Sequence, residues 1–255
     1  MIKKQQLRPL DTSIDDDEIE KFSVLSDEWW DPHGSFRLLH KLNPARLNYI
    51  RDNICFQYGR NNRTQKPFEA LRILDIGCGG GLLTEPMARL GAKVTGFDAS
   101  ENNILIARSH SKRMGLDIDY RFSTVENIAD SGERFDIVLN MEVVEHVANA
   151  ERFLEASCAL VAPGGMMFVA TLNRTLKSFA FAIMGAEYLL RWLPRGTHDW
   201  RKFLKPSEMA KVFRSGGLGE ISFAGMVFDP LRDEWRIDER DISINYLGCA
   251  VRPNA

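Results

Sequence analysis

The sequence predicts an α/β fold built on a doubly wound, mostly parallel sheet of seven strands. From residue 71 onward, short apolar runs alternate with segments of helical periodicity, which is typical of parallel strands joined by helical crossovers. A glycine-rich stretch at residues 77–81 directly follows the first apolar run, and glycine lets a backbone turn sharply or approach a ligand closely. The sheet should therefore begin with a strand, a glycine loop and a helix.

Seven segments are the expected strands. Pro163-Gly164-Gly165 turns the chain into the fifth of them, and the last two are expected to pair as an antiparallel hairpin after a helix at residues 205–217. The expected strands are residues 72–76, 93–97, 119–122, 135–140, 166–171, 219–228 and 242–251.

Residues 1–66 are expected to form an N-terminal helical cover and a linker. An acidic, solvated lead-in at residues 11–20 precedes a helix at residues 22–30, a second helix at residues 35–50 and a polar linker at residues 59–66. The main domain is then expected to span residues 67–255.

The overall charge and the cysteines exclude several classes of protein. A net charge of −2 and an isoelectric point near 6.2 give no basic field for binding nucleic acid. The four cysteines are dispersed, so neither a disulfide framework nor a zinc cluster is expected. Residues 1–10 lack the apolar block of a secretory signal, and the longest apolar run, residues 179–190, is shorter than the roughly 20 residues of a bilayer span. A cytoplasmic protein is expected.

The glycine loop is flanked by two aspartates. Dinucleotide sites require a third glycine where this chain has Leu82, which weakens a nicotinamide interpretation. Asp75 suits a cationic amino group better than a phosphate, and Asp98, at the end of the second expected strand, suits the two hydroxyls of a ribose. The alternative for each aspartate is a helix cap or a turn residue.

These motifs resemble the class I S-adenosylmethionine-dependent methyltransferases, which have a Rossmann-like fold. The resemblance implies that the loop, with Gly77 and Gly79, holds the methionine part of the cofactor. This chain has Glu126 near the position where many relatives bind adenine with an aspartate, so backbone and Glu126 remain alternatives for adenine. The matching motifs are Leu74-Asp75-Ile76-Gly77-Cys78-Gly79-Gly80-Gly81 and Gly96-Phe97-Asp98.

Motifs along nearly the whole chain resemble the ubiquinone-biosynthesis O-methyltransferases. The resemblance implies methylation of a phenolic oxygen on a 2-polyprenyl-6-hydroxyphenol and on 3-demethylubiquinol, and cofactor contacts at Arg46, Gly77, Asp98 and Met141. A guanidinium such as that of Arg46 suits the methionine carboxylate. The motifs are Trp29-Trp30-Asp31-x-x-Gly34, Leu39-His40-x-x-Asn43-Pro44-x-Arg46-Leu47, Met141-Glu142-x-x-Glu145-His146-Val147, Thr171-Leu172-Asn173-Arg174, Gly185-Ala186-Glu187-Tyr188 and Gly196-Thr197-His198-Asp199.

Three polar residues just beyond the fourth strand are candidates for the chemistry. Glu142 and Glu145 are three positions apart, so at the start of a helix they would share one face with His146 close by. The resemblance implies that this set binds Mg²⁺, which prefers oxygen ligands. Two alternatives remain: His146 acts as the general base, or the two glutamates only stabilise a helix N-terminus.

A helical insert is expected at residues 172–205, after the fifth strand. It carries seven basic and two acidic residues, hence +5 in a chain of net charge −2, and its apolar side chains are flanked by cations. That composition is typical of a segment lying on an anionic membrane surface, so peripheral association with the inner face of a membrane is expected. A lid over the active site is the alternative, and other ubiquinone-biosynthesis proteins are further expected partners.

Two other functions fit the same sequence. A class I methyltransferase for another small phenol or lipid would share the cofactor motifs, and a lipid-binding module without turnover would share the fold. The complete set of Asp75, Gly77, Gly79 and Asp98 argues against the second.

Overall fold

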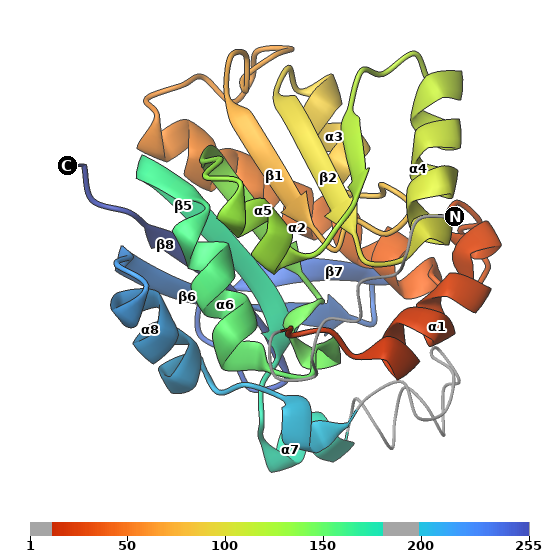
Figure 1. Ribbon diagram of the computed structural model, residues 1–255. Coiled ribbons are helices and arrows are strands. Elements are labelled where there is room, and N and C mark those ends of the chain that lie inside the picture. Colours follow the sequence, from red (N-terminus) through yellow and green to blue (C-terminus); the bar gives the residue numbers. More distant parts are fainter. Residues whose placement is uncertain (1–11, 181–198, 255) are drawn as a thin grey trace.

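The protein forms one mixed, mostly parallel sheet of eight strands, covered on both faces by helices (Figure 1). This computed structural model describes residues 12–180 and 199–254. The strands lie in the order β3-β2-β1-β4-β5-β8-β6-β7. Their bounds are β1 Arg72–Ile76, β2 Lys93–Asp98, β3 Asp119–Phe122, β4 Phe135–Met141, β5 Val161–Leu172, β6 Gly219–Asp229, β7 Glu234–Asp238 and β8 Asn245–Val251.

The strands β1 to β5 form the parallel half and confirm the first five predicted strands. Ile73 of β1 is in register with Val94 of β2 and with Ile137 of β4. Side chains on both faces of β1 and β4 are buried, as expected where helices cover both sides of a sheet. The carboxyl ends of β1, β2 and β4 therefore come together at one edge.

The antiparallel half differs from the prediction in two ways. The sheet has eight strands rather than seven, because β7 pairs with β6 through Val227 and Arg236. The predicted antiparallel pairing of residues 219–228 with residues 242–251 is confirmed, because β6 pairs with β8. The two strands do not form a hairpin, because β7 lies between them along the chain and is itself the hairpin partner of β6. Charged side chains occupy alternate positions of β7 and leave only Trp235 and Ile237 to mark it as a strand.

The helices form two layers, α5, α6 and α8 on one face and α2 and α3 on the other (Figure 1). The helix α8 confirms the helix predicted at residues 205–217. Most of the predicted insert, residues 181–198, lies outside the described residues, between α7 and the short 3-10 helix η4. The bounds are α3 Thr84–Arg89, α4 Glu101–Arg113, α5 Val125–Asp130, α6 Ala150–Ala159, α7 Leu176–Ser178, η4 Trp200–Lys202 and α8 Pro206–Ser215.

No helix within residues 12–180 and 199–254 is long and apolar enough to cross a bilayer. The longest apolar run, residues 179–190, on which the prediction rests, lies mostly outside the described residues.

The N-terminal cover consists of α1 (Asp16–Val24), the 3-10 helix η1 (Ser26–Glu28) and α2 (Arg37–Gln57). The predicted solvated lead-in and the helix predicted at residues 22–30 are wrong. Asp15 instead caps α1 by accepting the Glu18 amide at 3.3 Å, and the acids that follow lie in the first helical turn, where the helix dipole stabilises negative charge. The predicted acidic run is therefore the start of the helix itself.

The helix α2 joins the cover to the sheet. Its Ile50 and Ile54 are fully buried in the same hydrophobic cluster as Ile73 and Val94 of the sheet. The domain boundary at residue 66 stays a prediction, but α2 packs as part of the main core.

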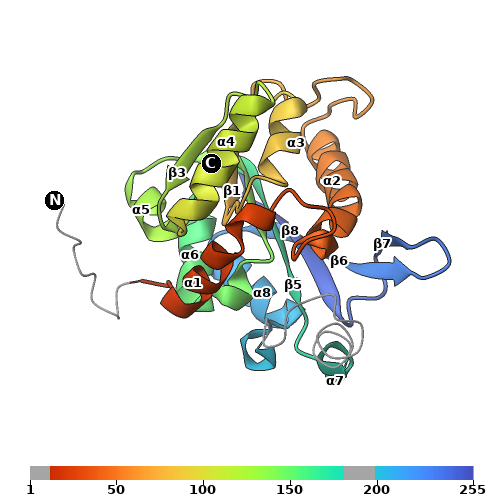
Figure 2. The same cartoon turned by 90° about the vertical axis from the view of Figure 1, so that its right-hand side faces the viewer.

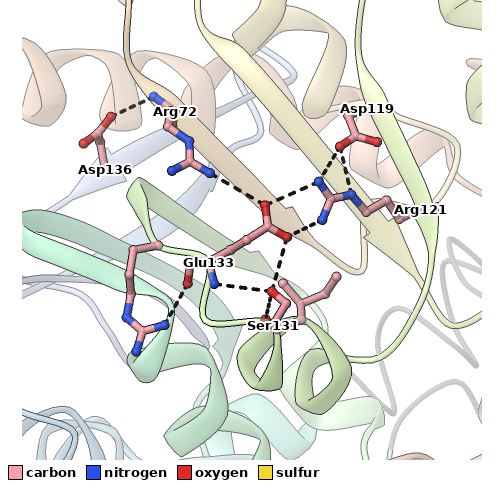
Figure 3. Close-up of polar contacts among 8 residues, drawn as sticks. Arg72, Asp119, Arg121, Ser131, Glu133 and Asp136 are labelled. Atoms are coloured by element: carbon pink, nitrogen blue, oxygen red, sulfur yellow. Dashed lines mark hydrogen bonds and ion pairs between the residues drawn. The ribbon is translucent and has the colours of Figure 1, made fainter.

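A network of charged side chains connects β1, β3 and the segment before β4 (Figure 3). Glu133 pairs with Arg121 at 2.5 Å and with Arg72 at 3.7 Å, and the Arg72 amide donates to Asp136 at 2.8 Å. The bond from Arg121 holds the pKa of Glu133 below its ordinary value. Since none of these residues lines a cavity described below, we assign the network to the stability of the fold.

The four cysteines are free and buried. Cys55 lies in α2, Cys78 in the glycine loop, Cys158 in α6 and Cys249 in β8. Burial raises the pKa of all four thiols, and that of Cys158 and of Cys249 to about 12.

Candidate functional site

Two adjoining cavities open at the carboxyl edge of the parallel strands. The first has a volume of about 970 Å³ and the second about 150 Å³. The residues that line both are Phe22, Trp29, Gly77, Glu142 and His146. The wall between the cavities is therefore built by the cover, the glycine loop and the segment after β4, and one elongated ligand can reach from one cavity into the other.

The glycine loop brings bare backbone to this edge. Gly79 has a φ of +52°, and a Cβ at this position would lie 2.3 Å from the ring of Trp29. Gly77 has a φ of +65°, and a Cβ there would lie 2.6 Å from Val143. Only glycine suits both the backbone conformation and the space, so the backbone of the loop can lie directly against Trp29 and Val143.

Asp75 lies in the buried part of β1 and lines the first cavity. The Thr84 hydroxyl donates to its carboxylate at 2.6 Å. Burial, with the nearby charge of Asp98, raises the pKa of Asp75 to about 7, and the bond from Thr84 opposes that shift. A cationic group in the first cavity would favour the ionised carboxylate, which suits the predicted contact with an amino group.

Asp98 lines the second cavity at the end of β2. Its carboxylate accepts the Gly79 amide at 3.0 Å, the Ser100 amide at 2.8 Å and the Asn103 side chain at 3.1 Å. Burial raises its pKa, although these bonds oppose the shift. Asp98 is thus tied to the glycine loop and lines the second cavity, and its contact with ribose hydroxyls stays a prediction.

The N-terminal segment closes the second cavity. The Ser13 amide donates to Glu126 Oε1 at 2.8 Å, and the Ser13 carbonyl accepts the Ala148 amide at 2.8 Å. Glu126 Oε2 is buried without a hydrogen-bond partner among the described residues. One carboxylate oxygen of Glu126 therefore holds the cover, and the other lacks a donor beside the cavity.

Two tryptophans of the cover lie against the glycine loop. The sequence predicted that they belong to the cover but predicted no chemistry for them. Trp29 donates its indole N–H to Asn103 at 2.9 Å, and Trp30 donates to the Gly80 carbonyl at 2.9 Å. Trp30 also stacks on His110 with ring centroids 3.5 Å apart. The tryptophan pair in the sequence was the available signal, but its partners lie 50 or more residues away along the chain.

The candidate residues after β4 adopt a geometry that the sequence did not predict. Glu142 has a φ of +57° and lies outside any helix, so the predicted helix start with Glu142 and Glu145 at i and i+3 is wrong. The side chain of Glu142 pairs with Arg46 at 2.5 Å, and both side chains are largely buried. Met141, which precedes it, lines the same cavity. Arg46, Met141 and Glu142 are therefore brought together.

Glu145 lies in the short 3-10 helix η2 (Val144–His146) and is buried. It accepts the Thr171 hydroxyl at 3.0 Å through Oε2, while Oε1 has no hydrogen-bond partner among the described residues. Burial, and then the charge of neighbouring Glu142, raises the pKa of Glu145 well above its ordinary value. Two neighbouring carboxyl groups thus face one cavity, and burial favours the neutral form of Glu145.

His146 contacts a different partner. Its Nδ1 lies 2.8 Å from Glu18 Oε2 of α1, and its ring packs edge-on against Phe22. Burial acts to raise the pKa of Glu18, but the hydrogen bond and charge of His146 outweigh it and lower that pKa. A carboxylate only accepts, so Nδ1 of His146 carries the proton of this hydrogen bond.

The predicted three-residue metal set is therefore only partly assembled. Among the residues that the structure describes, no three acidic, histidine or cysteine side chains are placed to hold a metal together. Without His146, Glu142 and Glu145 still suit Mg²⁺. This ion commonly binds one or two carboxylates and keeps water or substrate oxygens as its other ligands. The unpartnered Oε1 of Glu145 fits that use, whereas His146, held by Glu18, does not complete the set.

Comparison with known proteins places the chain among methyltransferases. A family described as a methyltransferase domain matches residues 38–221. The chain is 57% identical over 244 residues to a ubiquinone biosynthesis O-methyltransferase of Chelativorans sp. (strain BNC1), covering 96% of each chain. It is 55% identical to a protein of the same name from Dinoroseobacter shibae, covering 94% of this chain and 97% of that one.

A solved structure supports the fold. Magnesium protoporphyrin IX methyltransferase from Synechocystis PCC 6803, solved with bound SAH, aligns with a TM-score of 0.65 over 93% of this chain and 100% of its own. Its sequence identity is 18%, so this likeness concerns the architecture alone. The predicted class I methyltransferase fold is confirmed.

Proposed function

Since the chain belongs to the ubiquinone biosynthesis O-methyltransferases, we propose that it methylates a phenolic hydroxyl of polyprenyl catechol-type intermediates at two steps, on 2-polyprenyl-6-hydroxyphenol and on 3-demethylubiquinol. The observation that carries this proposal is the pair of adjoining cavities, which share Gly77 and Glu142. A methyl donor lying along the loop would span both, and an aromatic acceptor would fill the larger one.

The cofactor-binding residues divide between the two cavities. Asp98 of the second cavity would accept the ribose hydroxyls, and Asp75 of the first would pair with the amino group. Arg46 would bind the carboxylate, with Gly77, Gly79 and Met141 bordering the methionine part. Bound S-adenosylmethionine supplies the methyl group, and the chain's task is to hold an acceptor oxygen in line with it.

His146 is the residue best placed to remove the acceptor proton. The contact with Glu18 supports this function, because it holds Nδ1 as the donor; in the neutral ring Nε2 would then be the nitrogen that accepts a proton. The phenolic proton would pass to Nε2 as the oxygen forms its bond to the methyl carbon, and the electrons of the breaking carbon–sulfur bond would stay on sulfur.

Glu142 and Glu145 would hold Mg²⁺ at the acceptor end of the first cavity. Such an ion would lower the pKa of the catechol hydroxyls and fix their orientation. Their buried, closely spaced carboxylates support this assignment, and Arg46, which pairs with Glu142, would then turn to the methionine carboxylate.

Residues 172–205 would place the enzyme on an anionic membrane surface, at the inner face of the membrane where its lipid substrates reside. The side chain of Arg201 is 85% exposed, and Leu176 is 82% exposed. Reversing the charges of Arg191, Arg195, Arg201 and Lys202 should release the protein from anionic liposomes. The same reversal at Arg63, Lys66, Lys112 and Arg113, on exposed positions elsewhere, should not; equal loss in both variants would indicate a nonspecific charge effect.

The main test is an assay with labelled S-adenosylmethionine and short-chain forms of the two catechols, followed by product analysis. We expect O-methylation of both and Mg²⁺ stimulation. Glu145→Gln should reduce turnover at least about a hundredfold while SAH still binds, and Glu155→Gln on the exposed side of α6 should match the parent. Turnover of unrelated phenols alone would favour another small-molecule methyltransferase, and binding without turnover would favour a lipid-binding module.

A further inference from the structure

The first cavity is divided by polarity. At one end lie Asp75 of β1, Arg46 and the polar residues of the segment after β4. At the other end, α2 and the hairpin of β6 and β7 supply an apolar wall. We call this set the apolar wall: Leu38, Leu42, Met226, Phe228 and Trp235.

The apolar wall is built by two segments far apart in sequence. Trp235 of β7 packs against Phe228 of β6 with ring centroids 5.5 Å apart, and Met226 and Leu42 belong to one buried cluster against which Trp235 packs. Figure 2 shows α2 and β7 lying close together on one side of the molecule. At the hairpin turn, Lys41 pairs with Asp233 at 2.9 Å.

The base of the hairpin is fixed in position. The Met226 amide donates to the buried Asn245 side chain at 3.2 Å. A Cβ on Gly225 would lie 1.7 Å from the Asp241 carbonyl oxygen, so glycine is required where the segment before β8 crosses β6. Met226 therefore faces the cavity from a rigid support.

The size and continuity of the cavity argue for an elongated apolar occupant. A volume of about 970 Å³ is at the upper end of the range for ligand pockets, roughly 300–1,000 Å³. Met141, next to Glu142, packs on the same cluster as Leu42 and Met226, so the wall begins directly beside the predicted reaction site. An aromatic head held at Glu142 would thus project any ring substituent along apolar side chains.

We propose that the apolar wall binds the isoprenoid tail of the acceptor and makes the enzyme select tailed over tailless catechols. This inference rests on the proposed function. It assigns a substrate-selecting function to β7, the strand that the sequence did not predict. Without Trp235, the cavity would lose the side chain that packs on Phe228 and completes the wall. Burying hydrocarbon against such a wall is favourable in proportion to the apolar area removed from water.

The far end of the tail would leave the cavity through its exposed rim. Val24 is 73% exposed, and the ion pair of Lys177 with Asp241 is exposed on the lining of the same cavity. Lys177 lies at the start of the insert of residues 172–205. Only the first isoprene units would therefore touch the wall, and longer tails would continue outward past Lys177.

The test measures kcat/KM for a series of catechols with no tail and with one, two and three isoprene units. In the parent enzyme we expect kcat/KM to rise with tail length and then to level off once the tail outgrows the cavity. Trp235→Ala should lower the ratio of the two-unit to the tailless substrate about tenfold. Leu38→Trp, which narrows the cavity from a half-buried position, should lower the same ratio and thus provides a second variant should Trp235→Ala fold poorly.

The matched control is Ile237→Ala, on the same strand and the same face as Trp235 but outside the cavity lining. It should leave the ratio unchanged. A ratio unchanged in both Trp235→Ala and Leu38→Trp, or lowered equally in Ile237→Ala, would overturn the tail-binding wall while the O-methyltransferase stands. Absence of turnover of every catechol by the parent enzyme would instead overturn the proposed function.

Discussion

The cofactor end and the acceptor end of the site are built in opposite ways. The cofactor end is formed mainly within residues 75–103, by backbone amides, glycines of positive φ and two aspartates. The acceptor end is formed by side chains from α1, α2, the segment after β4 and the hairpin of β6 and β7. One end depends on a local backbone conformation, and the other depends on the packing of distant segments.

This difference determines how each end responds to mutation. A site built from backbone tolerates few substitutions, because even the one Cβ atom added to a glycine meets a neighbour that cannot move away. A side-chain wall can lose one member and keep its others, so its losses should be partial and should depend on the ligand. The following predictions test that contrast, from the largest expected effect to the smallest.

Gly79→Ala should weaken SAH binding at least about a hundredfold. The new Cβ would meet Trp29 at 2.3 Å in addition to the strain of a φ of +52°. Gly115→Ala is the matched control, because Gly115 has a φ of +66° and an added Cβ there would have no neighbouring atom within 4 Å. Titration calorimetry with SAH on both variants separates the effect of the collision with Trp29 from that of backbone strain. Similar losses of SAH affinity in the two variants would show that the contact with Trp29 is not the cause.

Asp75 should make cofactor affinity depend on pH. Its pKa of about 7 keeps it largely protonated in the empty protein below that pH, whereas a cationic amino group requires the carboxylate. Binding must then release a proton, so affinity should fall about tenfold per pH unit below 7 and should be flat above it. SAH titrations should show this slope in the parent and lose it in Asp75→Asn, and a slope that persists in Asp75→Asn would assign it to another group.

Trp29→Phe tests whether the N-terminal cover contributes to cofactor affinity. Loss of the hydrogen bond to Asn103 should cost about 1 kcal/mol, or roughly fivefold in SAH affinity. Trp200→Phe, which loses a comparable bond to the Thr175 carbonyl outside both cavities, should bind SAH as the parent does. An unchanged affinity in Trp29→Phe would confine the cofactor end to the main domain.

Glu133→Gln should have the smallest effect, on stability alone. It removes the partner of Arg121 and Arg72 in a partly exposed network, which should lower the free energy of unfolding by about 1 kcal/mol at neutral pH. Since the folded pKa of Glu133 is lowered from 4.5, this contribution is present above 4.5 and is lost as the pH falls through the folded value. Denaturant unfolding of both proteins, at neutral pH and below the folded pKa, measures it, and altered kcat would contradict a purely structural function.

The parallel half of the fold was predictable because its strands are buried on both faces and read as continuous apolar runs. The strand β7 was not predictable, because charged and apolar residues alternate along its five positions. Its stability comes from packing on α2. The eighth strand and the wall it completes are therefore consequences of tertiary structure.

The site divides in the same way. One short stretch of sequence was enough to predict that Asp75, Gly77, Gly79 and Asp98 lie together at the carboxyl edge of the strands. The pairing of Glu18 with His146 was not, because the two residues are 128 positions apart and only the folded cover brings them together.

The buried cysteines give the protein four natural reporters of local opening. Thiolates, not thiols, react with alkylating agents, and burial holds all four groups protonated in the native state. Each should therefore be labelled only when its own segment opens to solvent. Labelling rates read by mass spectrometry would rank the opening of α2 at Cys55, the glycine loop at Cys78, α6 at Cys158 and the sheet at Cys249, with no engineered probe.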